Sequence, residues 1–168
     1  MMVIGVSAGA GKSTFARKLS EILQIGVYHL DTMFWEPGWV EASFEDFRSR
    51  QHEIINNHHE WIIEGNYRNT FDMRVEAADT IIYLEKPLSV CLYRVLKRWL
   101  TYIGKDRPDR ALGCDEKIDA AFIKFILKTY FQRKKRMRQQ LQKLKSSKQV
   151  FILTTDKEIE FFLKSLSK

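Results

Sequence analysis

The chain has 168 residues, of which 45% are hydrophobic and 29% are charged, and its formal net charge is +7. This length and composition are typical of one soluble globular domain with a core of its own. We expect neither a membrane span nor a signal peptide, because no apolar run approaches the roughly 20 residues of a span and no charged leader opens the chain. Cys91 and Cys114 fit no C-x-x-C pattern, so we expect free thiols and a cytoplasmic location.

The positive charge is concentrated in residues 120–155, which contain no Asp or Glu. Subtracting their ten basic residues from the net charge of +7 leaves −3 for the remainder of the chain. Such a segment can bind nucleic acid by neutralising phosphates, here through residues 133–148. A solvated basic helix, or one that reaches towards nucleotide phosphates, accounts for the same residues. The ten are Lys124, Lys128, Arg133, Lys134, Lys135, Arg136, Arg138, Lys143, Lys145 and Lys148.

A phosphate-binding loop is indicated by Gly9-Ala10-Gly11-Lys12-Ser13-Thr14, which lies between a strand predicted over 2–6 and a helix predicted over 12–23. The glycines let the backbone turn its N–H groups inward, and the helix N-terminus adds to this anion site. Lys12 would reach the β- and γ-phosphates of ATP, and the Ser13 hydroxyl would bind Mg²⁺. The full pattern G-x-x-x-x-G-K-S/T fails at its first letter, where Val6 stands, so an ordinary glycine-rich turn is the alternative.

Further apolar segments predict four more strands, and segments with helical periodicity lie between them. This alternation predicts an α/β fold, with a five-stranded parallel sheet and helices on both faces, in a single domain over residues 1–168. The strands are expected over 27–30, 61–63, 80–84 and 149–153. The helices are expected from a Ser43 cap, over 87–99, over 115–145 with a break near 129–132, and from a Thr155 cap to the end.

Two carboxylates follow predicted strands at the edge where ligands bind in open α/β sheets. Asp31 follows the second strand, which puts it near the phosphate loop, although it could instead cap the next turn. Glu64 follows the third strand and is well placed to hold water on Mg²⁺. Arg68, four residues later, could pair with an anionic acceptor, or it could form an exposed salt bridge in a turn.

Other candidate site residues lie on the next elements. In the aromatic loop 32–40, Trp35 either belongs to the core or stacks on the acceptor. Arg94 and Arg98 are four residues apart, so they project from one helix face and could clamp phosphates, or they form a solvated basic face. Residues 101–115 are rich in glycine, proline and charge, which favours a lid that excludes water from the site.

Taken together, these motifs resemble the small adenylate-kinase-related P-loop proteins of bacteria, which are often labelled topology modulation proteins or kinases. The resemblance implies a nucleoside-monophosphate-kinase-like fold that binds ATP and Mg²⁺. It also implies that Asp31 orients or deprotonates an acceptor hydroxyl and that Arg94, Arg98 and Arg107 stabilise the transferring phosphoryl group. The third-strand carboxylate is often Asp in such proteins and is Glu64 here. The matching segments are 9–14, 28–31, 34–39, 61–67, 79–84, 94–98 and 107–109.

The sequence therefore predicts an ATP-dependent phosphotransferase that acts on a small molecule or nucleotide through a hydroxyl or a phosphate. A guanine-specific GTPase is disfavoured because the chain contains no N-K-x-D motif. The alternative is a nucleic-acid-associated NTPase or DNA-binding protein that uses the basic residues 133–148. Neither the acceptor nor the oligomeric state follows from the sequence.

Overall fold

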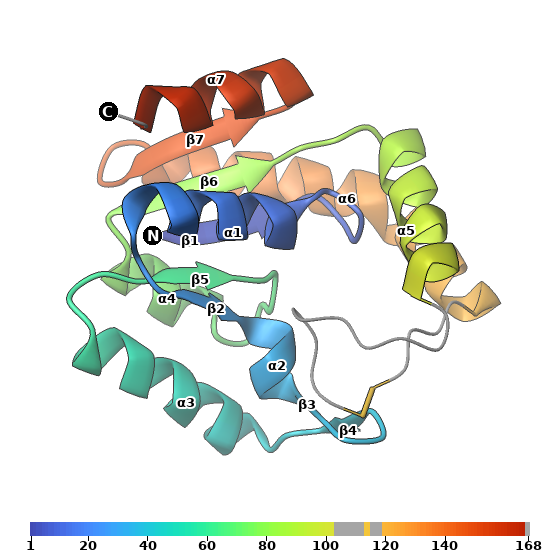
Figure 1. Cartoon of the computed structure of the whole chain (residues 1–168), viewed down its shortest axis with the longest axis horizontal. Helices are drawn as coiled ribbons and strands as arrows, with labels where there is room; N and C mark the ends of the chain where they lie inside the picture. The colour runs from blue at the N-terminus through green and yellow to red at the C-terminus, as the bar shows by residue number, and fades with distance from the viewer. Residues whose placement is uncertain (103–112, 115–118, 167–168) are drawn as a thin grey trace.

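The computed structural model describes residues 1–102, 113–114 and 119–166. Its centre is a sheet of five parallel strands in the order β2-β5-β1-β6-β7, which confirms the predicted architecture (Figure 1). Met2 of the central strand pairs with Ile63 on one side and with Ile81 on the other. The strands are β1 (Met2–Gly5), β2 (Val27–His29), β5 (Ile62–Glu64), β6 (Thr80–Leu84) and β7 (Gln149–Leu153).

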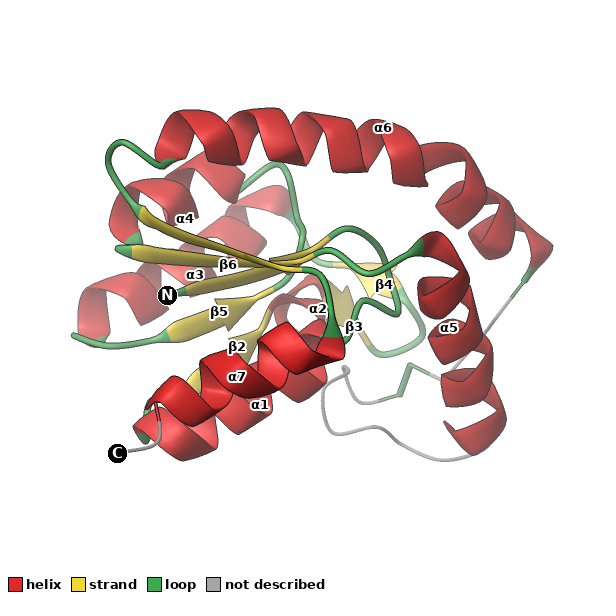
Figure 2. Ribbon diagram, turned by 90° about the horizontal axis from the view of Figure 1, so that it is seen from above, coloured by secondary structure: helices red, strands yellow, loops and turns green. Residues whose placement is uncertain are grey.

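Helices cover both faces of this sheet (Figure 2). Helices α1 (Lys12–Leu23) and α7 (Asp156–Leu166) lie on one face, and α4 (Phe71–Ala77) and α6 (Ala120–Leu144) lie on the other. Because of this covering, every residue of β1, β5 and β6 is buried, as expected of apolar central strands in a parallel sheet. Helix α5 (Leu88–Tyr102) stands beyond the carboxyl ends of the strands.

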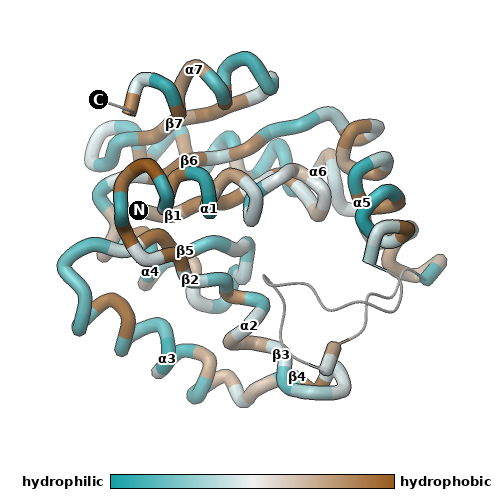
Figure 3. Tube along the Cα trace, viewed as in Figure 1, coloured by the Kyte–Doolittle hydropathy of each residue, from teal (hydrophilic) through white to brown (hydrophobic). Residues whose placement is uncertain are grey.

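Helix α3 (Phe44–Asn57) begins where the sequence predicts it. The Ser43 hydroxyl accepts a hydrogen bond from the Asp46 backbone N–H at 3.0 Å, as an N-cap should. Hydropathy alternates along the helix (Figure 3), so that its buried side carries Phe47 and Ile54. The final helix begins with a similar cap, in which the Glu158 N–H donates to the Thr155 hydroxyl at 3.1 Å.

Three parts of the fold differ from the expectation. The loop expected over 32–40 instead contains a short helix α2 (Leu30–Phe34) and a two-stranded hairpin of β3 (Trp35–Glu36) and β4 (Val40–Glu41). The predicted break near 129–132 was wrong, because α6 runs through this region. Its Thr129 hydroxyl bonds the Phe125 carbonyl at 2.8 Å, and its Tyr130 hydroxyl bonds the Lys86 carbonyl at 2.8 Å. Helix α4 was not predicted.

Helix α4 carries a fully buried arginine, Arg74, that organises the loop after β5. Its guanidinium donates to the carbonyls of Gly65 at 3.0 Å and Tyr67 at 2.6 Å, and its Nε donates to the Thr70 carbonyl at 3.3 Å. Burial lowers the pKa of Arg74 to about 10, yet the group remains charged at neutral pH. The loop over 65–70 is thereby held by a side chain that lies beneath it.

The lid expected over 101–115 lies mainly outside the described residues. Thr101 and Tyr102 end α5, and Gly113 and Cys114 contact the β3–β4 hairpin. The Gly38 N–H donates to the Gly113 carbonyl at 3.0 Å, and the Cys114 thiol donates to the Glu36 carbonyl at 3.2 Å. Among the described residues, no helix combines the length and apolar composition that a membrane crossing requires.

Replacing Arg74 with Leu should lower the free energy of unfolding by about 3 kcal/mol or more, because each buried carbonyl left unpaired costs roughly 1–3 kcal/mol. Urea denaturation followed by circular dichroism measures this change. Arg48→Leu, at an exposed position of α3, is the matched control and should change stability by less than about 0.5 kcal/mol. Similar stabilities for the two variants would contradict the assigned role of Arg74.

Candidate functional site

The loop between β1 and α1 requires glycine at two positions. Gly9 has φ 76° and Gly11 has φ 93°, both in the left-handed region that side chains disfavour. A Cβ at Gly9 would also lie 2.2 Å from the Cys91 carbonyl oxygen. Gly11 is the N-cap of α1 and has no side chain to satisfy the first N–H groups of the helix. These N–H groups are available to an anionic ligand, as the motif predicts.

Val6, which replaces the first glycine of the motif, fits the sheet without strain. Its N–H donates to the Leu84 carbonyl at 3.0 Å, and its side chain is only 1% exposed. Its φ is not among the positive values that require glycine. The backbone thus begins to bend at Val6, directly after β1, while the Val6 N–H keeps its hydrogen bond to β6.

The Lys12 side chain folds back over the loop instead of extending into solvent. A Cβ at Gly5 would lie 2.8 Å from Lys12 Cγ, so the absence of a side chain at Gly5 makes room for the lysine stem. Lys12 Nζ lies 3.8 Å from Glu64 Oε1. The amide of Asn66 holds Gly5 from the other side, since it donates to the Gly5 carbonyl at 2.8 Å and accepts from the Gly5 N–H at 2.9 Å.

Glu64 connects three neighbouring groups at the carboxyl end of β5. Its Oε2 accepts a hydrogen bond from the Ser13 hydroxyl at 3.0 Å and lies 2.9 Å from His29 Nδ1. Glu64 is only 6% exposed, and burial alone would raise its pKa. The bond to His29 and the charge of Lys12 outweigh burial, so the pKa of Glu64 lies below its ordinary value. Glu64 is thus held as a carboxylate.

Ser13 and Glu64 together fit a magnesium ion that is bound chiefly through a nucleotide. Mg²⁺ is commonly held by one or two protein oxygen ligands, with phosphate oxygens and water completing its shell. In the described part of the chain, no cluster of three or more His, Cys, Asp or Glu side chains could hold a metal by itself. The donor set therefore suits Mg²⁺ bound with a nucleotide better than a metal held by the protein alone.

Asp31 belongs to the first turn of α2, two residues after His29 of β2. The Tyr67 hydroxyl donates to Asp31 Oδ1 at 2.8 Å, and Asp31 itself is exposed. Burial and the nearby Asp31 charge raise the pKa of Tyr67, which keeps the phenol protonated as a donor. The Tyr67 ring packs against Phe34 and Phe47, with centroid distances of 4.7 and 4.9 Å. The aromatic cluster thereby fixes the phenol that holds Asp31.

Trp35 has features of both alternatives, a core residue and a ring that could stack on an acceptor. Its ring meets Phe34 edge to face at 4.9 Å and Trp39 at 5.2 Å, yet the residue is only half-buried. It packs within the aromatic cluster and also presents part of its surface to solvent. Trp39 adopts φ 65° in the β3–β4 turn, an uncommon value for a residue other than glycine.

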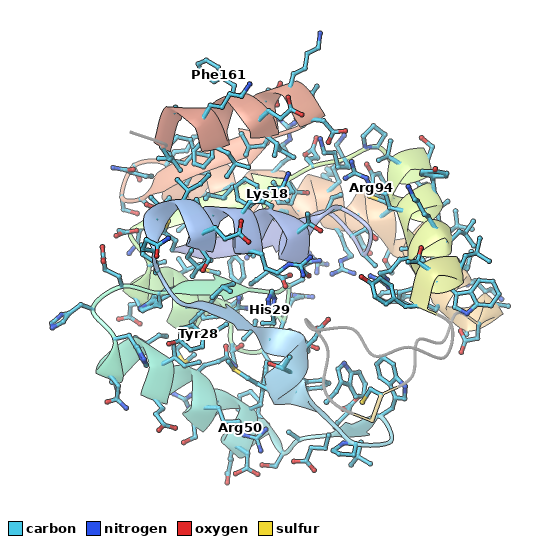
Figure 4. All side chains as sticks on the ribbon, viewed as in Figure 1. Lys18, Tyr28, His29, Arg50, Arg94 and Phe161 are labelled. Carbon is cyan, nitrogen blue, oxygen red and sulfur yellow. The ribbon has the colours of Figure 1, made fainter. Side chains whose placement is uncertain are left out.

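Arg94 lies between α5 and the start of α1 (Figure 4). A Cβ at Gly11 would lie 3.2 Å from Arg94 Nη1, so the guanidinium is directly beside the phosphate loop. Arg94 Nη2 donates to both carboxylate oxygens of Asp156, at 3.1 and 3.2 Å. Lys86 Nζ lies 2.9 Å from the same carboxylate. The Lys86 bond, with a further contribution from Arg94, lowers the pKa of Asp156.

Three further arginines were predicted to belong to the site. Arg98 follows Arg94 by one turn of α5 and is half-buried. Arg107 lies outside the described residues, so its predicted role stays a prediction. Arg68 is exposed and lines a cavity between the end of β1 and helix α6.

Sequence reasoning missed several residues that shape the site. His29 was interpreted only as part of a strand, although its place at the end of β2 could have indicated a side chain facing Glu64. Asn66 and Asp156 also follow strands, where ligand-binding loops are expected. Nothing in the local sequence indicates that Asp156 and Arg94 meet, because they are 62 residues apart.

The basic segment contributes to the protein's own structure. Arg138 donates to the two oxygens of Glu85 at 2.7 and 2.8 Å, and Lys134 Nζ lies 3.1 Å from the same carboxylate. Glu85 is 5% exposed, and these cations lower its pKa despite the opposing effect of burial. The ion pairs fasten α6 to the residue that directly follows β6.

No protein-family model matches the chain, and no curated protein matches it. Solved structures do resemble it. Shikimate kinase from Acinetobacter baumannii in complex with shikimate has a TM-score of 0.55 at 14% identity, covering 98% of this chain and 89% of that chain. A protein from Chloroflexus aurantiacus with a provisional kinase assignment has a TM-score of 0.55 at 14% identity, and the match covers 98% of this chain and 95% of that chain. An uncharacterised protein from Eubacterium ventriosum has a TM-score of 0.51 at 17% identity, and the match covers 98% of this chain and 96% of that chain.

The fold is the shikimate-kinase-like P-loop fold. At such identities the likeness extends to the fold, while function depends on the residues of the site.

The lowered pKa of Glu64 predicts a specific acid sensitivity. Ionised Glu64 stabilises the fold above its ordinary pKa of 4.5, and this contribution is lost as the pH falls through the lower folded-state value. As the pH falls from neutral to acid, the free energy of unfolding should therefore decrease less in Glu64→Gln than in the unmodified chain. Urea unfolding over a pH series measures the difference. Glu160→Gln, exposed on α7, is the control, and equal pH dependence in all three proteins would contradict the account.

Proposed function

We propose that this protein is a Mg-ATP-dependent phosphotransferase that transfers the γ-phosphoryl group to a small-molecule or nucleotide acceptor. The main support for the proposal is that Glu64 contacts both Lys12 and Ser13 at the end of a loop whose conformation requires glycine. The likeness of the fold to shikimate kinase supports the same reaction class. A place among the adenylate-kinase-related proteins labelled topology modulation proteins is part of the proposal, as is a cytoplasmic location.

Each group has a role that its position supports. The N–H groups of the loop and the Lys12 ammonium would hold the β- and γ-phosphates. Ser13 would bind Mg²⁺ directly, and Glu64 would bind it through water. The ion would neutralise charge that develops on the β- and γ-oxygens. Arg94, beside Gly11, would add positive charge over the same phosphates, with Arg98 and Arg107 as further contributors.

Asp31 would orient the acceptor and take its hydroxyl proton. The carboxylate is exposed, with one oxygen fixed by Tyr67, so its orientation is set before an acceptor arrives. Trp35, which is half-buried beside it, would supply an apolar wall for the acceptor.

The basic residues in 133–138 support a nucleic-acid function less well than they support a kinase. Of the five cations in 133–138, Lys134 and Arg138 bind Glu85, and Arg133 and Arg136 line the cavity beside β1. Lys135 alone among these five is exposed without such a role. Four of these five cations are thus engaged by Glu85 or line the cavity, which favours a role within the kinase over nucleic-acid binding.

Lys12→Ala should reduce phosphoryl transfer by at least about 100-fold, because it removes a positive charge directed at the transferring phosphate. ADP formation across a panel of alcohols, nucleotides and acids measures the loss. Lys18 is exposed further along α1, so Lys18→Ala removes an equal charge away from the loop and should retain activity. Acceptor-independent ATP hydrolysis throughout the panel, or full activity in Lys12→Ala, would contradict the proposed reaction.

Asp31→Asn should lower kcat by roughly 10²–10⁴-fold, since amide replacement removes the general base. Affinity for ATP, measured by equilibrium binding, should stay nearly constant because Asp31 does not belong to the phosphate loop. Tyr67→Phe should cause a smaller loss, because the carboxylate remains and only its orientation relaxes. An Asp31→Asn variant with unchanged kcat would remove Asp31 from the mechanism.

A further inference from the structure

A cavity of about 100 Å³ lies between the ends of β1 and β6 and helix α6. Gly5 forms part of its wall, so the cavity adjoins the start of the phosphate loop. Three arginines line it: Arg68 from the loop after β5, and Arg133 and Arg136 from α6. Asp72 is the one acidic residue among the described residues that line it. The volume has room for a group of several heavy atoms.

These three guanidiniums have no anionic partner within the part of the chain that the structure describes. Three other arginines of the described residues near the site have partners: Arg74 bonds backbone carbonyls, Arg94 bonds Asp156 and Arg138 bonds Glu85. Arg133 contacts an aromatic ring instead, with its Cζ 5.7 Å from the centroid of Phe125.

The clustering of these charges is unfavourable unless an anion joins them. Arg133 is half-buried, and burial together with the nearby charge of Arg68 lowers the pKa of its guanidinium. Like charges that are partly removed from water repel one another more strongly than they would in solution. An anion in the cavity would relieve this repulsion and would accept hydrogen bonds from several N–H groups at once.

We propose that this cavity binds the phosphate group of a phosphorylated alcohol, and that this molecule is the acceptor of the phosphotransferase. The proposal rests on the proposed function, and it adds the chemical class of the substrate. Arg68, Arg133 and Arg136 hold the phosphate that the acceptor already carries, while Asp31 receives its free hydroxyl.

The charge of the cavity favours a phosphate over a carboxylate. Three guanidiniums and the Asp72 carboxylate leave a formal charge of +2. A phosphate monoester carries about −1.5 to −2 at neutral pH and offers three acceptor oxygens to the arginine forks. A carboxylate has a single negative charge and two oxygens, so it would leave one arginine uncompensated.

The loop after β5 links the cavity to Asp31. Asn66 and Arg68 line the cavity, and Tyr67 between them donates its hydroxyl hydrogen to Asp31. Arg74 fixes this loop from below through the Gly65 and Tyr67 carbonyls. One short segment therefore carries both an arginine of the cavity and the tyrosine that holds Asp31, as an acceptor that engages both would require.

The position of Asp31 favours a hydroxyl as the attacking group. A hydroxyl must lose a proton as it attacks, whereas an acceptor phosphate is already ionised and would be repelled by a carboxylate. Asp31 takes the proton from the acceptor O–H while that oxygen bonds to the γ-phosphorus. The bond from the γ-phosphorus to the β–γ bridging oxygen breaks, and ADP leaves with that electron pair.

The first test measures binding of inorganic phosphate in a Lys12→Ala background, which weakens the phosphate loop as a competing site. Isothermal titration calorimetry on the full chain compares Arg68→Gln, Arg133→Gln and Arg136→Gln. Each should weaken binding by roughly 10- to 100-fold, the value of one charge-assisted hydrogen bond or more. Lys135→Gln removes an equal charge from the exposed side of α6 and should change binding by less than about twofold. Equal affinity in all variants would overturn the proposal.

Arg68 is exposed and Arg133 lies over the Phe125 ring, so Arg68→Gln and Arg136→Gln are safer substitutions than Arg133→Gln. If Arg133→Gln fails to fold by circular dichroism, these two variants decide the binding test. Acetate provides the comparison anion. Binding of acetate as tightly as phosphate would also overturn the proposal.

The second test measures kcat/KM for pairs of alcohols that differ only by a phosphate, such as glycerol and glycerol phosphate or ribose and ribose 5-phosphate, with shikimate as a carboxylic acid. The phosphorylated member should be preferred, and Arg136→Gln should raise its KM more than it lowers kcat. Equal or better use of the unphosphorylated alcohols or shikimate would overturn the phosphate assignment but leave the kinase intact. If no acceptor is phosphorylated, the proposed function fails, and the acceptor assignment fails with it.

Discussion

The site depends on one buried carboxylate. Glu64 is held at the end of β5, where burial would normally favour its neutral form, and Lys12, Ser13 and His29 keep it ionised. These three residues come from α1 and β2, so the carboxylate fixes two elements relative to the central sheet. Glu64 also provides a counter-charge for Lys12, whose stem lies over Gly5.

The surroundings of Glu64 are organised by similar polar contacts across the sheet edge. Asn66 bonds both backbone groups of Gly5, and Arg74 holds the carbonyls of the loop that contains Asn66. On the other side of the phosphate loop, Asp156 gathers Lys86 and Arg94. The cations nearest the loop are thus positioned in advance by carboxylates, an arrangement that lowers the cost of reorganisation when a nucleotide binds.

Much of the architecture follows from local sequence, because apolar strands and capped helices are specified over short distances. The helix over 12–23, the Ser43 cap and all five sheet strands were predictable in this way. The placement of Asp31 and Glu64 after two paired strands, β2 and β5, was also predictable, since the carboxyl ends of parallel strands meet at one edge. The continuity of α6 was not, because it depends on tertiary contacts of Tyr130 that no local pattern reveals.

The remaining features of the site depend on contacts between distant segments. Arg94 bonds Asp156, which lies on a different helix. Arg68 lines the same cavity as Arg133 and Arg136, which come from α6, far along the chain. Helical spacing alone could not distinguish these inward cations from a solvated face, since both alternatives place basic residues on one side of α6. The fold resolves this ambiguity by turning Arg133 and Arg136 towards the sheet edge.

The most direct test of the central claim is the effect of Mg²⁺ on affinity for ATP in the unmodified chain and in Glu64→Gln. Equilibrium binding of a fluorescent ATP analogue, with and without Mg²⁺, provides the measurement. If Glu64 and Ser13 hold the ion with the nucleotide, Mg²⁺ should strengthen binding in the unmodified chain and should do so much less in Glu64→Gln. An equal effect of Mg²⁺ on both proteins would contradict the account.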